Sequence, residues 1–132
     1  MKILALDYGS RRIGLALGDS RLGLATPVGS LENRGEATLQ SIVEKVKEHG
    51  VSLVLVGLPL TPTGREGQRA SEVKEFFSRL RELMPQEVDM LLWDERDTTQ
   101  EAYRLLQGHR KKRELKDSLS AYVLLLEYLE SL

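Results

Sequence analysis

The chain has 132 residues, a length typical of one domain and short for two substantial ones. Hydrophobic residues make up 41% of it and charged residues 30%, which excludes global disorder and predicts a packed core under a charged surface. The lack of cysteine excludes disulfides and Cys-ligated metal centres, and favours a reducing compartment such as the cytoplasm. The N-terminal apolar run ends at Asp7, so neither export nor a membrane span is expected.

The N-terminal part of the chain is predicted to form three strands, over residues 2–6, 12–18 and 24–31. The first is apolar on both faces of the pleat, as is typical of a strand that is covered on both sides. A turn at residues 8–10 joins the first two strands into a hairpin. Pro27 places the third strand at an edge of the sheet, because proline has no N–H to donate to a neighbouring strand.

Helices and strands alternate over the rest of the chain. The pattern predicts a helix over residues 37–48, a strand over 53–56, a helix over 67–83, a strand over 88–93, a helix from Thr98 that Gly108 stops, and a last helix over 117–130. Right-handed crossovers and short connections favour an α/β fold with one mixed five-stranded sheet in the order 3-2-1-4-5. In this sheet the second strand is antiparallel to the first, the first, fourth and fifth strands are parallel, and helices cover both faces.

Three acidic residues stand near the places where ligands of open α/β sheets collect, beyond the carboxyl ends of the parallel strands. Asp7 follows the first strand, Glu95 follows the fifth, and Asp117 lies at or beside the start of the last helix. Each has a plain structural alternative, which is a turn-forming Asp, a solvated loop acid or a helix N-cap, respectively. If the three converged, each pair would repel by about 4 kcal/mol at ~4 Å and an effective dielectric constant of ~20.

Divalent cations would offset such a repulsion. Mg²⁺ and Mn²⁺ prefer oxygen ligands, and two of these ions about 3.5–4 Å apart can activate water and stabilise the leaving oxygen of a phosphodiester. A convergence of the acids is therefore the observation on which a prediction of metal-dependent hydrolysis depends.

Basic residues are concentrated in one segment, although the whole chain has a formal charge of −1. Between Arg104 and Lys116, six basic residues against one acid give a formal charge of +5. The run from Arg110 to Arg113 is interpreted as a basic loop beside the acids that attracts phosphates, or else as a solvated charged loop. Because aromatic residues are few, nucleic acid is expected to be held by its phosphates rather than by stacking of its bases.

A second basic region lies where residues 64–67 open the second predicted helix. Free amides at a helix N-terminus can receive a phosphate, and Arg65 and Arg69 stand beside them in the sequence. A plain loop-to-helix junction explains the same pattern equally well.

Four motifs in this order resemble those of the YqgF/RuvX family. They are Asp7 to Ala16, Gly57 to Leu60 with Gly64 and Gly67, Asp94 to Thr99, and Asp117 ahead of Ala121. The resemblance covers nearly the whole chain and implies one RNase H-like nuclease domain over residues 1–132. The family is named for Holliday junction resolution and, in bacteria, for maturation of the 5′ end of pre-16S rRNA.

The resemblance also implies roles for individual residues. Asp7, Glu95 and Asp117 would be the catalytic acids that bind Mg²⁺ or Mn²⁺. The expected nucleic-acid contacts are Arg11, Arg12, Arg65, Arg69, Arg96, Arg110, Lys111, Lys112 and Arg113. Whether Asp94 or Asp97 joins the acids is open at this point.

The sequence departs from the family pattern at two places and from RuvC-type resolvases at a third. Thr61–Thr63 replaces a polar turn, and Asp97 stands where leucine is usual. Gly57 follows the fourth strand, where RuvC-type resolvases carry an acid. This difference from RuvC-type resolvases favours processing of the pre-16S rRNA 5′ end over junction resolution as the leading hypothesis.

Three alternatives are carried alongside. The chain could resolve Holliday junctions, which requires a dimer for symmetric cutting, or act as a non-catalytic adaptor that binds nucleic acid. A monomer or weak homodimer is expected. The hairpin Asp7–Gly9 is also found in actin-like ATPases, but that fold closes two domains around the nucleotide and this chain is long enough for one.

Overall fold

The computed structural model describes residues 1–59, 67–94 and 113–132. Several predictions therefore lie outside the described residues: the helix from Thr98 to Gly108, the turn Thr61–Thr63, Gly64, and the site candidates Arg65, Glu95, Arg96, Asp97, Arg110, Lys111 and Lys112. The backbone of Arg113 is described, but its side chain is not.

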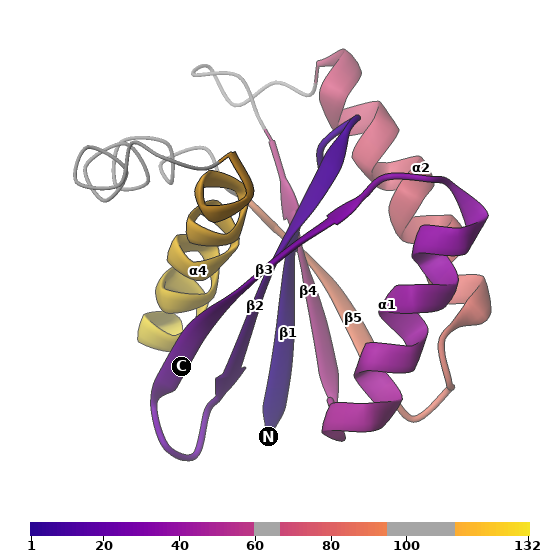
Figure 1. Cartoon of the computed structure of the whole chain (residues 1–132). Coiled ribbons are helices and arrows are strands. Elements are labelled where there is room, and N and C mark those ends of the chain that lie inside the picture. Colours follow the sequence, from indigo (N-terminus) through magenta and orange to yellow (C-terminus); the bar gives the residue numbers. More distant parts are fainter. Residues whose placement is uncertain (60–66, 95–112) are drawn as a thin grey trace.

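The described elements form one five-stranded sheet and three helices (Figure 1). They are β1 (Lys2–Asp7), β2 (Arg12–Asp19), β3 (Leu24–Glu32), α1 (Glu36–His49), β4 (Leu53–Leu58), α2 (Gln68–Leu83), β5 (Asp89–Asp94) and α4 (Arg113–Ser131). The sheet order is β3-β2-β1-β4-β5. β2 is antiparallel to β1 and β3, whereas β1, β4 and β5 are parallel. The predicted topology and the edge position of the Pro27 strand are confirmed.

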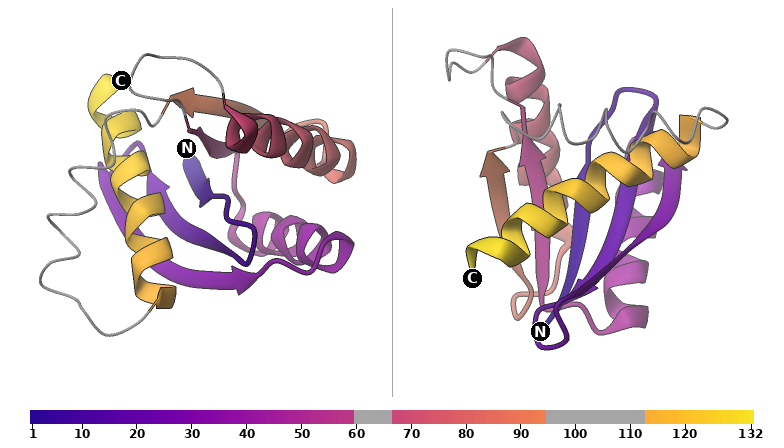
Figure 2. Two further views of the ribbon diagram at one scale, coloured as in Figure 1. Left: turned by 90° about the horizontal axis from the view of Figure 1, so that it is seen from above. Right: turned by 90° about the vertical axis from the view of Figure 1, so that its left-hand side faces the viewer.

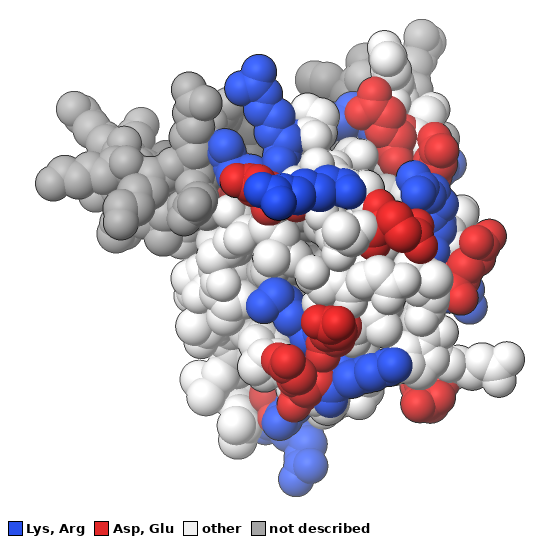
Figure 3. Space-filling view, turned by 45° about the vertical axis from the view of Figure 1, so that its right-hand side comes forward, with Lys and Arg blue, Asp and Glu red and all other residues white. Residues whose placement is uncertain are grey.

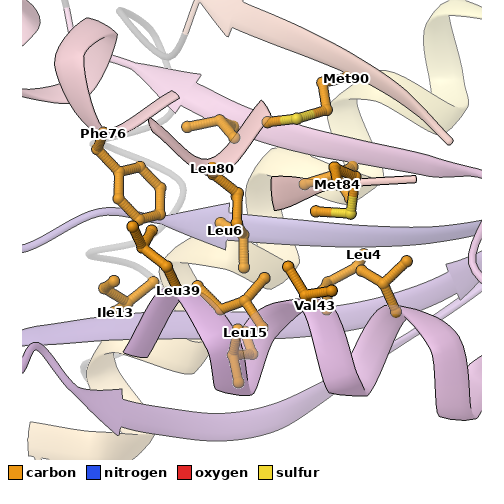
Figure 4. Packing of buried hydrophobic residues seen from close by; sticks show 14 of the residues in the cluster. Leu4, Leu6, Ile13, Leu15, Leu39, Val43, Phe76, Leu80, Met84 and Met90 are labelled. Atoms are coloured by element: carbon orange, nitrogen blue, oxygen red, sulfur yellow. The ribbon is translucent and has the colours of Figure 1, made fainter. Parts of the chain in front are cut away.

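The sheet separates two layers of helices, with α1 and α2 on one face and α4 on the other (Figure 2). Leu4 and Leu6 of β1 pack in the cluster beneath α1 and α2, which Figure 4 shows from close by. Ile3 and Ala5, on the opposite face of the same strand, pack against α4. Side chains alternate between the faces along a strand, so Asp7 belongs to the face that α4 covers.

α4 begins earlier than the sequence predicts. Its first residue is Arg113, so Asp117 lies one turn inside the helix and the N-cap interpretation of Asp117 is wrong. None of the described helices combines the length and the apolar character that a membrane crossing requires.

Small residues on β2 let α4 lie close to the sheet. Gly14, Ala16 and Gly18 share the face that α4 covers, and a Cβ on Gly14 would come within 2.0 Å of the Asp117 carbonyl oxygen. A Cβ on Gly18 would come within 2.8 Å of the Leu125 side chain. These close contacts place the start of α4 over β2 at the level of Asp7, because Asp7 and Gly14 are paired in the sheet.

Candidate active site

Asp7 is the last residue of β1 and stands at the carboxyl edge of the parallel strands. Gly14 of β2 is its partner in the register. On the other side of β1, Leu6 is paired with Val56 of β4 in parallel register. The next residue on β4, Gly57, therefore lies beside Asp7. Because both flanking residues are glycine, no neighbouring side chain of the sheet fills the space beside the Asp7 carboxylate.

The environment of Asp7 opposes its negative charge. Burial is the largest cause and raises the pKa of Asp7 from 3.8 to about 6. The positive charge of Arg69 acts against this shift, and the negative charge of Asp117 adds to it. A desolvated, part-buried carboxylate beside a second acid favours either a proton or a bound cation, so the electrostatics of this position favour a positive ion.

Asp117 is brought to Asp7 from the far end of the chain by α4. The Arg12 Nε donates a hydrogen bond of 2.7 Å to Asp117 Oδ2, and the two side chains are 26% and 23% exposed, respectively. This ion pair links the first residue of β2 to the start of α4. Arg12 therefore fixes the direction of the Asp117 carboxylate as well as balancing its charge.

The turn between β1 and β2 is held by Asn33, a residue that the sequence analysis missed. Asn33 Nδ2 donates to the Gly9 carbonyl at 3.0 Å, and its backbone N–H donates to the Arg11 carbonyl at 2.8 Å. An Asn between a strand and a helix is a local turn signal, but no local signal indicates that its amide reaches a distant turn. Asn33 supports the backbone that follows Asp7.

Arg69 approaches the same edge from the first turn of α2. Its Nη2 donates to the Tyr8 carbonyl at 2.8 Å, which holds the guanidinium close enough to Asp7 to act on its pKa. Beside it lies an open groove of about 370 Å³, lined by Tyr8, Ser10, Gln68, Arg69 and Glu72. One described arginine of the second basic region thus lies next to the acids.

A family model described as RuvX, Holliday junction resolvase, matches residues 1–131. The chain belongs to the RuvX family. A relative from Sulfurihydrogenibium sp. (strain YO3AOP1), named "Putative pre-16S rRNA nuclease", is 40% identical over 133 residues, covering 99% of this chain and 91% of the relative. A relative with the same name from Desulforudis audaxviator (strain MP104C) is 38% identical over 136 residues, covering 99% and 95%.

Two solved structures share the architecture of this RuvX family member. The fowlpox virus Holliday junction resolvase superposes with a TM-score of 0.63 at 12% identity and covers 99% of both chains. T. thermophilus RuvC, in complex with a Holliday junction substrate, superposes with a TM-score of 0.60 at 12% identity and covers 99% of this chain and 96% of RuvC. At this identity the likeness concerns the fold, and the predicted RNase H-like fold is confirmed.

The structure brings together part of the site predicted for a RuvX family member. Asp7, Asp117, Arg12 and Arg69 meet at one edge, and Arg11 is exposed in the adjacent turn. Within residues 1–59, 67–94 and 113–132, no three His, Cys, Asp or Glu side chains form a group that could hold a metal ion. Asp94 ends β5 with an exposed side chain, and Glu95 follows it outside the described residues.

The donor set suits a hard divalent cation. Asp7 and Asp117 offer carboxylate oxygens, which Mg²⁺ and Mn²⁺ prefer, and the raised pKa of Asp7 reflects an unfavourable negative charge that a cation would offset. Arg12 already contacts one oxygen of Asp117, as is common for a second layer of residues around metal-binding carboxylates.

The charges of the described residues are mixed over the face in Figure 3. Basic and acidic side chains are interspersed there, consistent with the formal net charge of −1. Attraction of a phosphate to this RuvX family member is therefore expected from local arginines rather than from the overall field.

Proposed function

We propose that this chain is a metal-dependent nuclease that hydrolyses phosphodiester bonds of structured RNA, with the 5′ end of pre-16S rRNA as its substrate. The names of relatives at 38–40% identity over 99% of the chain support the substrate. The observation that carries the chemistry is the part-buried Asp7 carboxylate, whose pKa is raised mainly by desolvation and also by the nearby charge of Asp117.

Asp7 and Asp117, together with Glu95, would hold Mg²⁺ or Mn²⁺. When bound there, such ions activate water for in-line attack and stabilise the charge on the leaving oxygen. β5 is parallel to β1 and ends at Asp94, at the same carboxyl edge of the sheet as Asp7. Glu95 is the next residue in the sequence. This three-acid set is part of the proposal.

The neighbouring residues orient the acids and the substrate. Arg12 fixes Asp117 through its Nε, and the guanidinium has further N–H groups that can donate to a phosphate. Arg69, held by the Tyr8 carbonyl, is placed to contact a phosphate that lies across Asp7. Arg11, in the adjacent turn, extends this row of cations. Further contacts are proposed for Arg65, Arg96, Arg110, Lys111, Lys112 and Arg113.

Cleavage of a pre-16S rRNA fragment by wild type and by Asp7→Asn tests the proposal. The substitution keeps the shape of the side chain but removes the charge that binds the cation, so a loss of more than about 100-fold in rate is expected with either Mg²⁺ or Mn²⁺. Chelation of the metal is expected to abolish the wild-type activity. Asp89→Asn is the matched control, because Asp89 is an exposed acid at the opposite end of β5. Equal cleavage by wild type and Asp7→Asn contradicts the proposal.

Two other outcomes would favour the alternative functions. Faster cleavage of a four-way DNA junction than of the RNA, with the same dependence on Asp7, supports junction resolution. Retained RNA affinity with no Mn²⁺ binding in calorimetry at millimolar metal supports a non-catalytic adaptor. The position next to Asp7 on β4 is Gly57 rather than an acid, which is the reason for ranking the RNA substrate first.

A further inference from the structure

The edge strand β3 carries a β-bulge opposite Leu15 of β2. The register shifts between the residue pairs on either side of Leu15, so this residue faces both Val28 and Gly29. Gly29 has a φ of 94°, a backbone conformation that glycine adopts without the strain other residues incur. A bulge interrupts the ladder of hydrogen bonds between strands, so the backbone groups at this point need other partners.

Ser118 of α4 supplies those partners. Its hydroxyl donates to the Leu15 carbonyl at 2.8 Å and accepts from the Gly29 N–H at 2.9 Å. The side chain is 1% exposed, so solvent does not compete for either bond. One buried hydroxyl thus joins α4 to two strands of the sheet at a single point.

This attachment point is adjacent to Asp117. Along the same stretch of α4, the Asp117 backbone lies against Gly14, and its carboxylate is held by Arg12. The later turns of α4 are attached differently, by apolar packing of Ala121, Leu124 and others against the sheet. Loss of the Ser118 hydroxyl would therefore release the first turns of the helix while the rest stays packed.

We propose that Ser118 is a positioning residue for the active site: its hydroxyl fixes the start of α4 in the β3 bulge and thereby sets the position of Asp117 relative to Asp7. This inference rests on the proposed function, since the separation of the two acids affects activity only if they bind metal together. Without the hydroxyl, the Leu15 carbonyl and the Gly29 N–H lose their partner, and α4 must shift or admit water there.

Ser118→Ala and Thr38→Ala form a matched pair of variants. The Thr38 hydroxyl makes the same kind of bridge, donating to the Glu32 carbonyl at 2.7 Å and accepting from the Arg34 N–H at 2.7 Å, and the residue is 5% exposed. It lies on α1, which carries neither acid. Both variants lose one buried hydroxyl with two hydrogen bonds, so a comparable decrease in thermal stability is expected.

The readouts are the Mn²⁺ dissociation constant from calorimetry and the kinetic constants of RNA cleavage, at a temperature where both variants are folded. Ser118→Ala is expected to weaken Mn²⁺ binding and to lower kcat by about 10- to 100-fold, with KM changed by less than about 2-fold. For Thr38→Ala, the Mn²⁺ dissociation constant, kcat and KM are each expected to stay within about 2-fold of the wild-type values. Equal effects of the two variants on Mn²⁺ binding would overturn the role of Ser118.

Amide hydrogen exchange separates a failure of this inference from a failure of the proposed function. If wild type binds no Mn²⁺, the proposed function fails. Amide exchange does not depend on metal binding, so it still tests whether Ser118 holds the start of α4. In Ser118→Ala, the amides of residues 117–120 are expected to exchange faster, while those of residues 123–128 keep wild-type rates. Unchanged exchange at residues 117–120, or an equal acceleration along all of α4, would overturn the inference.

Discussion

Gly14 of β2 lies directly against the backbone of Asp117, so close that a Cβ on the glycine would come within 2.0 Å of the Asp117 carbonyl oxygen. Gly14 is also the sheet partner of Asp7. One residue without a side chain therefore sets how closely the two acids approach each other. The geometry of the site is therefore sensitive to the addition of even one methyl group at Gly14.

Gly14→Ala is expected to displace the start of α4 and to weaken Mn²⁺ binding by at least about 10-fold, with a loss of about 1–3 kcal/mol in the free energy of unfolding. Gly18→Ala is the control, since its Cβ would meet Leu125 and the Leu24 carbonyl near the other end of β2. It should destabilise the fold less than Gly14→Ala, because its nearest contact is the flexible end of the Leu125 side chain, and it should leave metal affinity unchanged. Calorimetry and urea unfolding measure both quantities, and a Gly14→Ala protein with wild-type affinity would contradict the argument.

Asp7→Asn is expected to stabilise the metal-free protein at neutral pH. The pKa of Asp7 is raised from 3.8 to about 6 in the folded state. As the pH rises from about 4 to about 6, the unfolded chain releases this proton more readily than the folded protein, so wild-type stability falls. The loss is complete about one pH unit above the folded pKa and corresponds to about 3 kcal/mol at most.

Urea unfolding in the presence of a chelator measures this effect. The stability difference between Asp7→Asn and wild type should grow between about pH 4 and about pH 7, stay constant above that range and disappear below it. Added Mn²⁺ should stabilise wild type alone, because only wild type binds the ion in its folded state. If Asp7→Asn is less stable than wild type at pH 7.5 without metal, the negative charge of Asp7 is not unfavourable in the folded protein and the argument fails.

Arg12→Gln is expected to lower kcat by about 10- to 100-fold, because the Asp117 carboxylate loses the donor that fixes its direction. The cost in stability is expected to be about 1 kcal/mol or less, since the ion pair is partly solvated. Arg34→Gln, which removes an exposed ion pair with Glu32, is the control and should keep wild-type kcat. Single-turnover cleavage rates are measured for Arg12→Gln and Arg34→Gln. Identical rates for the two variants would exclude an orienting role for Arg12.

Arg69→Gln is expected to weaken RNA binding and to reduce the slope of log affinity against log salt concentration by about one, the value for one lost phosphate contact. Arg81→Gln is the control, because Arg81 lies in the last turn of the same helix, α2. Binding titrations at several salt concentrations measure the slopes. An unchanged slope for Arg69→Gln would show that Arg69 contacts no phosphate.

Much of the fold could be predicted because its signals are local. The continuous apolar strands, the hairpin turn after Asp7 and the edge position given by Pro27 each depend on a few neighbouring residues. The site was harder to predict, because its parts come from separate elements. The amide of Asn33 on the Gly9 carbonyl and the hydroxyl of Ser118 in the β3 bulge are contacts between distant segments, and no local pattern indicates them.

The sequence by itself determined the strand order and placed Asp7 at the carboxyl edge of the sheet, since hydrophobic periodicity and turn residues act over short distances. Only the tertiary structure decided what surrounds that acid. It placed Asp117 one turn inside α4, paired it with Arg12, and revealed that Gly14 lets the helix approach. The physical reason is that the separation of Asp7 and Asp117 depends on how a helix packs across a sheet, and packing is decided by the whole set of surfaces in contact.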